Sequence, residues 1–425
     1  MTGPRQPLLK YVTAWLLCGM VTKALYAESK EFPIDLELYA DARLGVASGE
    51  PTWFKDWLGK GRYGGTRDGG TRTYARIPEL SLIAKADVTW DIKAFTHLKY
   101  DPEQDIPIDL VEAFVTYAPV PKSSFSYQFK AGVFFPHISR ENVGVAWTTP
   151  YTITPSAINS WVGEEIRVLG IEGKVTYRTD LFKLSLTGAV FGFNDPAGTL
   201  LAFRGWGLGD AKVGAFGELP LPPLPSIGKD STFVKQPLWV RPVREIDDRP
   251  GYYTALDIQY ADNLQFGAFY YDNRGNPEII RNKQYAWDTR FWNFYIETTL
   301  SHEIKLISQY MTGNTKMGEI WRNGQRFLDV DYDAGFLLIS KKMERYRVSG
   351  RFDWFSTDDN SFESIDNNNE TGTAFTAAVS IDVFKKDKIL IEYLRIDSER
   401  PSRETIGFLA DQSNDILQVS FRKRF

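Results

Sequence analysis

The chain has 425 residues, of which 43% are hydrophobic and 24% charged, and its mean hydropathy is −0.30. This composition is too polar for a bundle of membrane-spanning helices, and no apolar run reaches the roughly 18 residues that such a helix needs. The formal net charge of −4 gives no electrostatic basis for binding nucleic acid, which we therefore exclude as a partner.

Residues 1–27 have the pattern of a secretory signal peptide. Arg5 and Lys10 precede an apolar stretch of suitable length, and small residues follow that suit cleavage. Cys18 is the only cysteine and lies in this segment, so we expect neither disulfides nor thiolate-bound metals in the exported protein. The sequence thus predicts an exported protein whose mature part spans 28–425.

Apolar and polar residues alternate through most of the mature part. In the first such segment, 34–46, every second residue from Ile34 to Val46 is apolar, and charged residues such as Asp35 and Glu37 lie between them. A period of two indicates a β-strand with one apolar and one polar face. The other predicted strands are 78–88, 90–100, 109–117, 125–135, 165–177, 181–193, 251–260, 264–273, 288–300, 303–313, 329–341, 344–356, 371–383, 388–398 and 415–425.

The connections between these segments alternate between short and long. An even number of strands joined in this way is typical of outer-membrane β-barrels, whereas a soluble β-sandwich would distribute long loops over both ends. We therefore predict an all-β protein: a transmembrane antiparallel β-barrel of 16 strands, with short periplasmic turns and long extracellular loops.

The last predicted strand supports a closed barrel. Leu417, Val419, Phe421 and the terminal Phe425 lie on one face of it. The segment looks like the closing strand of a bacterial outer-membrane barrel, which pairs with the first strand and is recognised by the barrel-assembly machinery.

Aromatic residues flank the predicted short turns on the apolar face, where an interfacial girdle is expected. They are Trp90, Tyr117, Tyr177, Tyr260 and Tyr346.

A barrel of this size has too many strands to be filled by their own side chains and is expected to enclose an aqueous lumen. The connection 136–164 is long, has few charges and contains Trp147, Tyr151 and Trp161. Because so apolar a loop is not expected to extend into water, we predict that it folds inward as a third loop and constricts the pore. The alternative is a cap over the extracellular mouth.

The connection 194–250 is predicted as a long extracellular loop. Its prolines and glycines favour ordered turns without helix. Such a loop could cover the pore, reach a neighbouring subunit or contact a ligand, and the sequence does not choose among these.

One region of the chain resembles a known family. A strand over 112–117 leads into Lys130–Pro136 (KAGVFFP), and the long third loop then ends at 163–165 (GEE). This arrangement resembles the phosphate-selective porin O/P family. The resemblance implies a sixteen-stranded homotrimer whose third loop folds into each pore, lined by basic side chains. Here the third loop offers only Arg140 and His137 as basic groups.

The predicted wall supplies further basic side chains that would attract anions in a water-filled pore. The pore-lining candidates are Lys93, Lys99, Lys130, Arg140, Arg345, Arg347 and Arg351. The same alternation predicts that four acidic side chains also point inward: Glu297, Asp331, Asp333 and Asp353. The alternative is therefore a wall of mixed charge with weak ion selectivity.

The sequence offers no catalytic constellation. His97, His137 and His302 lie far apart in the predicted topology, so we expect no enzyme activity, no cofactor and no metal site. A barrel lipase or protease would need a nucleophile and a base near one strand end.

The function expected is that of a porin in a Gram-negative-type outer membrane: passive diffusion of small hydrophilic solutes, with a mild preference for anions such as phosphate. The alternatives are a receptor or adhesin barrel, and a substrate-specific channel for a sugar or an organic acid. The expected partners are outer-membrane lipid and lipopolysaccharide, the assembly machinery, small solutes or anions, and further copies of the chain in a homotrimer.

Overall fold

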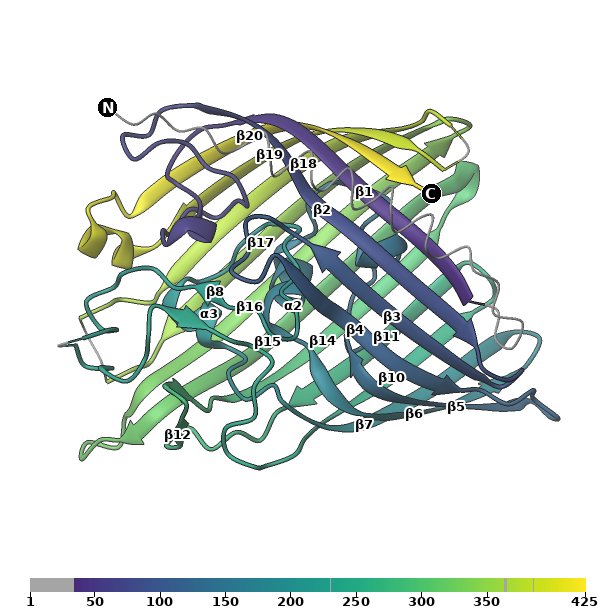
Figure 1. Ribbon diagram of the computed structural model, residues 1–425, viewed down its shortest axis with the longest axis horizontal. Helices are drawn as coiled ribbons and strands as arrows, with labels where there is room; N and C mark the ends of the chain where they lie inside the picture. The colour runs from purple at the N-terminus through teal and green to yellow at the C-terminus, as the bar shows by residue number, and fades with distance from the viewer. Residues whose placement is uncertain (1–33, 230, 363–364, 385) are drawn as a thin grey trace.

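Sixteen antiparallel strands close into one barrel (Figure 1). The computed structural model describes residues 34–229, 231–362, 365–384 and 386–425, so the predicted signal peptide lies outside the described residues. In chain order the barrel strands are β1 (Ile34–Ala47), β2 (Arg72–Asp87), β3 (Ile92–Tyr100), β4 (Ile108–Tyr117), β5 (Phe125–Phe134), β6 (Val168–Arg178), β7 (Phe182–Gly192), β10 (Gly251–Tyr260), β11 (Leu264–Asp272), β14 (Asp288–Thr299), β15 (Ile304–Ile320), β16 (Arg326–Met343), β17 (Tyr346–Asp359), β18 (Glu370–Asp382), β19 (Lys388–Glu399) and β20 (Asp411–Arg424). The predicted sixteen-stranded barrel is confirmed.

The connections between barrel strands contain only small elements. They are η1 (Trp53–Lys55), η2 (Val145–Trp147), α2 (Ala157–Glu165), α3 (Thr199–Phe203), β8 (Leu219–Pro220), β9 (Trp239–Val240), β12 (Ile280–Arg281), β13 (Gln284–Tyr285), η3 (Ser301–Glu303) and η4 (Pro401–Ile406). Among the described residues no helix is both long enough and apolar enough to cross a membrane.

The chain ends close the barrel. Strand β20 pairs with β1, with Phe421 opposite Ala42 and Leu417 opposite Val46. The amide of Phe425, the residue predicted to end the closing strand, donates to the carbonyl of Leu38 at 3.0 Å. This pairing leaves neither β1 nor β20 as an open edge, which is what a barrel in lipid requires.

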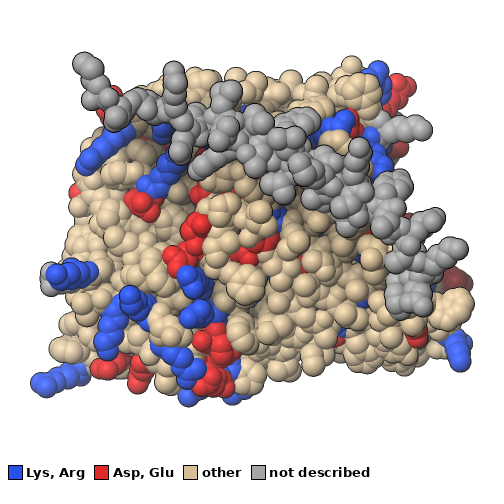
Figure 2. Space-filling model, viewed as in Figure 1, with Lys and Arg blue, Asp and Glu red and all other residues tan. Residues whose placement is uncertain are grey.

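The outer wall is apolar between its two ends. Phe352 of β17 and Leu417 of β20 are 48% and 53% exposed. The residues directly before and after each of them in the sequence face inward and are buried. In the view of Figure 2, charged side chains gather mainly toward the end with the long loops, and other residues cover most of the wall beyond them. The girdle residues Trp90 and Tyr260 are also exposed beside short turns.

Charge on the lipid face should therefore destabilise the barrel in a depth-dependent way. Phe352→Arg is expected to cost about 2–4 kcal/mol because it places a cation in hydrocarbon. Asp358→Arg, on the same strand face but beyond the aromatic Trp354, is the matched control, with an expected cost of about 0–1 kcal/mol. Urea unfolding in phospholipid vesicles measures both, and equal costs would contradict this placement of the wall.

Candidate functional site in the barrel lumen

The third loop lies inside the barrel. Its helix α2 begins after Ser156, whose hydroxyl accepts a hydrogen bond from the amide of Asn159, and all nine helical residues are buried. The ring of Trp161 packs edge-on against Phe291 of β14 and Tyr332 of β16, with centroids 5.4 and 5.6 Å apart. An aromatic wall and an aromatic loop thus form a shared core within the lumen.

Arg351 of β17 fixes the start of this helix. Its guanidinium forms ion pairs with Asp353 at 2.8 Å and with Glu141 of the third loop at 3.2 Å. It also donates to the carbonyls of Thr154 and Pro155, at 2.7 and 3.0 Å. Because all three charged side chains are fully buried, this predicted pore-lining arginine is an anchor for the loop in the structure described.

Arg140 ties the beginning of the third loop to other strands of the wall. Its guanidinium pairs with Asp257 of β10 and lies 3.4 Å from the ring centroid of Tyr295. The backbone amide of Arg140 donates to the side chain of Gln309 on β15, at 3.0 Å. The loop is thereby held from several directions.

The connection 194–250 differs from the predicted extracellular loop, because its first part also lies in the lumen. All five residues of α3 are buried, and Arg204 forms a buried ion pair with Glu164 of α2 at 2.7 Å. Trp206 donates its indole N–H to the carbonyl of Ser356 on β17, at 2.9 Å. The sequence left the role of this connection open, and nothing in the order of its residues indicated the inside of the barrel.

Beyond α3 the same segment reaches the wall formed by the first strands. Asp210 pairs with Arg43 of β1 at 2.7 Å and with Arg62 at 3.2 Å, and Lys212 pairs with Glu79 of β2 at 2.5 Å. Burial alone would raise the pKa of Asp210, but the two arginines outweigh it and hold that pKa well below its ordinary value. The carboxylate is therefore charged at neutral pH.

The first long connection supplies a third luminal segment. Lys60 forms a fully buried ion pair with Glu370 of β18 at 2.6 Å and donates to the carbonyl of Arg204 at 3.0 Å. Glu50 of the same connection pairs with Arg403 at 2.7 Å. Nothing in the sequence of this connection predicted its place in the lumen.

The remaining basic candidates lie in different surroundings. Lys93 is exposed and pairs with Asp87 at 3.2 Å, and Arg345 is exposed and donates to the carbonyl of Asp382 at 3.3 Å. Two others are ion-paired with inward acids: Lys99 with Asp101 at 3.4 Å and Lys130 with Glu172 at 2.9 Å. The candidates therefore do not form one continuous basic surface.

Arg347 differs from these candidates. It donates to the hydroxyl of Ser340 at 2.9 Å and lies 5.2 Å from the ring centroid of Tyr151. Among the described residues, no carboxylate forms an ion pair with it. Tyr151 itself is buried. Trp147, another of the aromatic residues predicted to fold inward with the third loop, stacks on Phe135 with ring centroids 4.2 Å apart.

Two predicted inward acids lie on the outer face of β16. Asp333 accepts a hydrogen bond from the hydroxyl of Tyr310 at 2.5 Å, and Asp331 is exposed and accepts from Asn314 at 2.6 Å. The assignment was wrong because the apolar face of this strand, which includes Tyr332, faces the luminal core instead of lipid. The other two acids, Asp353 and Glu297, do face inward.

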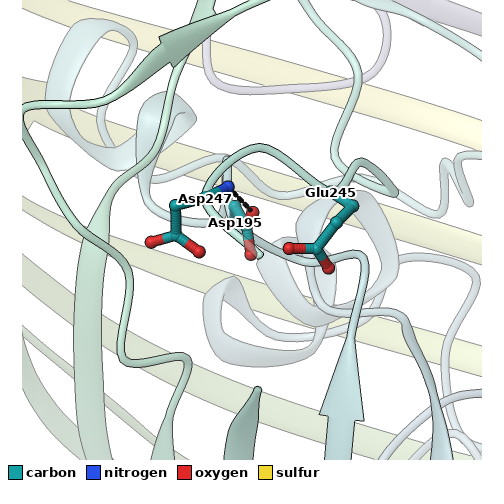
Figure 3. A group of neighbouring side chains, drawn as sticks. All are labelled: Asp195, Glu245 and Asp247. Atoms are coloured by element: carbon teal, nitrogen blue, oxygen red, sulfur yellow. Dashed lines mark hydrogen bonds between the residues drawn. The ribbon is translucent and has the colours of Figure 1, made fainter. Parts of the chain in front are cut away.

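The carboxylates of Asp195, Glu245 and Asp247 gather at the end of the barrel with the long connections (Figure 3). Their oxygens lie within 4.8 Å of one another and could together ligate a cation. Asp195 accepts from the amides of Ile246 and Asp247, the latter at 3.1 Å, and Glu245 accepts from the amide of Phe193 at 3.0 Å. These hydrogen bonds from backbone amides explain why the carboxylates lie together: they hold the two ends of the connection against each other.

Titration of this cluster should loosen the loop as pH rises. Burial, followed by the charges of Glu245 and Asp247, raises the pKa of Asp195 from 3.8 to about 7. A raised carboxyl pKa gives stability that is complete below about pH 4 and is lost as pH rises toward 7. Amide exchange at Ile246 and Asp247 should therefore be faster at pH 8 than at pH 5, after correction for intrinsic rates.

Asp195→Asn keeps the accepting oxygen and removes the charge, so this pH dependence should largely disappear. An unchanged pH dependence in the variant would contradict the assignment to Asp195.

The luminal core should contribute strongly to stability. Trp161→Ala removes a fully buried indole, and such truncations cost about 3–5 kcal/mol. Phe216→Ala, at a position of the 194–250 connection that is 64% exposed, is the control and should change stability by roughly 0.5 kcal/mol or less. Urea unfolding distinguishes them, and a near-neutral Trp161→Ala would show that α2 does not pack as described.

No protein-family model and no curated protein matches the sequence. Solved structures do: the outer membrane channel DcaP of Acinetobacter baumannii is 11% identical, with a TM-score of 0.53, over 94% of this chain and 99% of that chain. OmpT is an outer membrane protein of Vibrio cholerae. Its mutant lacking loop L8 is 10% identical, with a TM-score of 0.50, over 93% of this chain and 100% of that chain. At these identities the likeness shows the fold alone: the chain has the closed barrel fold of these outer-membrane proteins.

Proposed function

We propose that this protein is an outer-membrane porin, a passive channel for small hydrophilic solutes. The observation that carries the proposal is the closed barrel with an apolar outer wall around an interior crossed by the long connections. An apolar exterior of this kind is stable in a bilayer, and closure satisfies every strand edge. The solved structures of similar fold include one described as an outer membrane channel.

The proposal includes export by the predicted signal peptide 1–27 and residence in a Gram-negative-type outer membrane. Outer-membrane lipid, lipopolysaccharide and the assembly machinery are the partners that this location implies. A homotrimer and relationship to the phosphate-selective porin O/P family rest on the sequence resemblance over about 110–170. A substrate-specific channel for a sugar or an organic acid is the second candidate, favoured by the dense packing of the luminal segments.

A mild anion preference is part of the proposal, with Arg347 as its foremost contributor. Its guanidinium faces the lumen near the short-turn end and has no ion-paired carboxylate among the described residues. Lys93 and Arg345 are exposed at the same end and could add to the field.

Purified protein in planar bilayers should conduct, and reversal potentials under a KCl gradient should indicate a modest excess of anion permeability. Arg347→Ala should shift the reversal potential toward cation selectivity, because it removes a luminal positive charge. Lys341→Ala is the control: this lysine lies at the same end but on the outer-face parity of β16, and should leave the value unchanged. Cation selectivity in the unmodified protein would refute the anion preference, and absence of any conductance in all variants would refute the channel.

A further inference from the structure

The inner part of the 194–250 connection crosses the lumen and touches walls that lie far apart around the barrel. Near its start, Thr289 of β14 donates to the carbonyl of Ala197 at 2.5 Å. Farther along, Trp206 reaches β17 and Asp210 reaches β1. At its end, the amide of Ala215 donates to the carbonyl of Leu110 on β4, at 2.7 Å.

The same segment is joined to the other two luminal segments. The amide of Gly209 donates to the hydroxyl of Ser160 in α2 at 3.0 Å, and the amide of Leu208 donates to the carbonyl of Lys60 at 2.7 Å. Arg204 adds its ion pair with Glu164. The three segments therefore form one body held together by polar contacts.

The third loop extends this body to the rest of the barrel. Gln418 of β20 donates to the hydroxyl of Thr154 at 3.1 Å, and Arg140 reaches β10. Lys60 reaches β18 through Glu370. Contacts of the body are thus distributed around the barrel circumference.

Water does not reach the middle of this body. Residues 199–206 are all buried, and the side chains of Arg204, Glu164, Lys60 and Glu370 are at most 1% exposed. A path for hydrated solutes needs accessible side chains along its length, and residues 199–206 offer none.

From these contacts we propose that residues 197–213 are a luminal plug that closes the half of the barrel nearer the long connections, and that solutes pass only when this segment moves. The inference rests on the proposed channel function.

The chemistry of the plug suits a movable element. Much of its attachment is through ion pairs, and a buried ion pair stabilises little in net because both ions lose their hydration. Displacement into a wetter lumen would rehydrate them. The segment also has little regular structure of its own beyond the five residues of α3.

Asp210→Asn tests the plug with little risk to folding. The substitution keeps the side-chain shape and removes the charge that pairs with two arginines. Each arginine retains another carboxylate, because Arg43 pairs with Asp41 at 2.6 Å and Arg62 with Asp101 at 2.9 Å. Asp331→Asn, on the outer face of β16, is the matched control.

A second variant removes the side-chain attachments of residues 199–213. Residues 199–213 are replaced one for one by glycine and serine, which preserves the length of the connection but leaves no side chain able to pack. Resistance of the folded barrel to unfolding by SDS confirms assembly, and planar-bilayer recordings measure the mean current per inserted molecule.

We expect a low mean current for the unmodified protein and for Asp331→Asn, a several-fold rise for Asp210→Asn, and a larger rise for the glycine–serine variant. A high, equal current in all four proteins would overturn the plug while leaving the channel intact. No current in any of them, the glycine–serine variant included, would overturn both proposals.

Discussion

The interior of this barrel depends on the pairing of buried charges. Arg351, Lys60 and Arg204 each lie in the lumen without contact with water, and each forms an ion pair with a carboxylate from a different part of the chain. Removing one partner of a buried pair leaves an uncompensated ion, which costs far more than the pair itself contributes. These pairs thereby define the arrangement of the luminal segments, whose helices α2 and α3 are short.

This pairing also limits how basic residues can act on a solute. A guanidinium that is already bound to carboxylates and carbonyls, as in Arg351, presents little net field to a passing ion. A group such as Arg347, which contacts a hydroxyl and an aromatic face, keeps its charge available. A count of the basic residues at inward-facing strand positions therefore overestimates the charge that a solute would meet.

The wall of the barrel is apolar on both sides over part of its height. The outer face is apolar and exposed, as lipid contact requires, while Trp161 and Trp206 pack against aromatic residues on the inner face of β14 and β16. A strand such as β16 then has apolar residues on both faces near its middle, where Phe336 faces in and Leu337 faces out. The alternation of apolar and polar residues, which identifies most strands, says little about which face is inner in such a strand.

The sequence by itself determined the barrel: the period of two, the alternation of short and long connections and the terminal aromatic residue are local features, and strand pairing follows from them. It also indicated an inward third loop, because Trp147, Tyr151 and Trp161 need burial. Only the tertiary structure decided that 197–213 and Lys60 share the lumen, and that Asp331 and Asp333 face outward. Those outcomes depend on which distant residues meet across the barrel, and the order of residues along one strand or loop holds no information about its partner on the opposite wall.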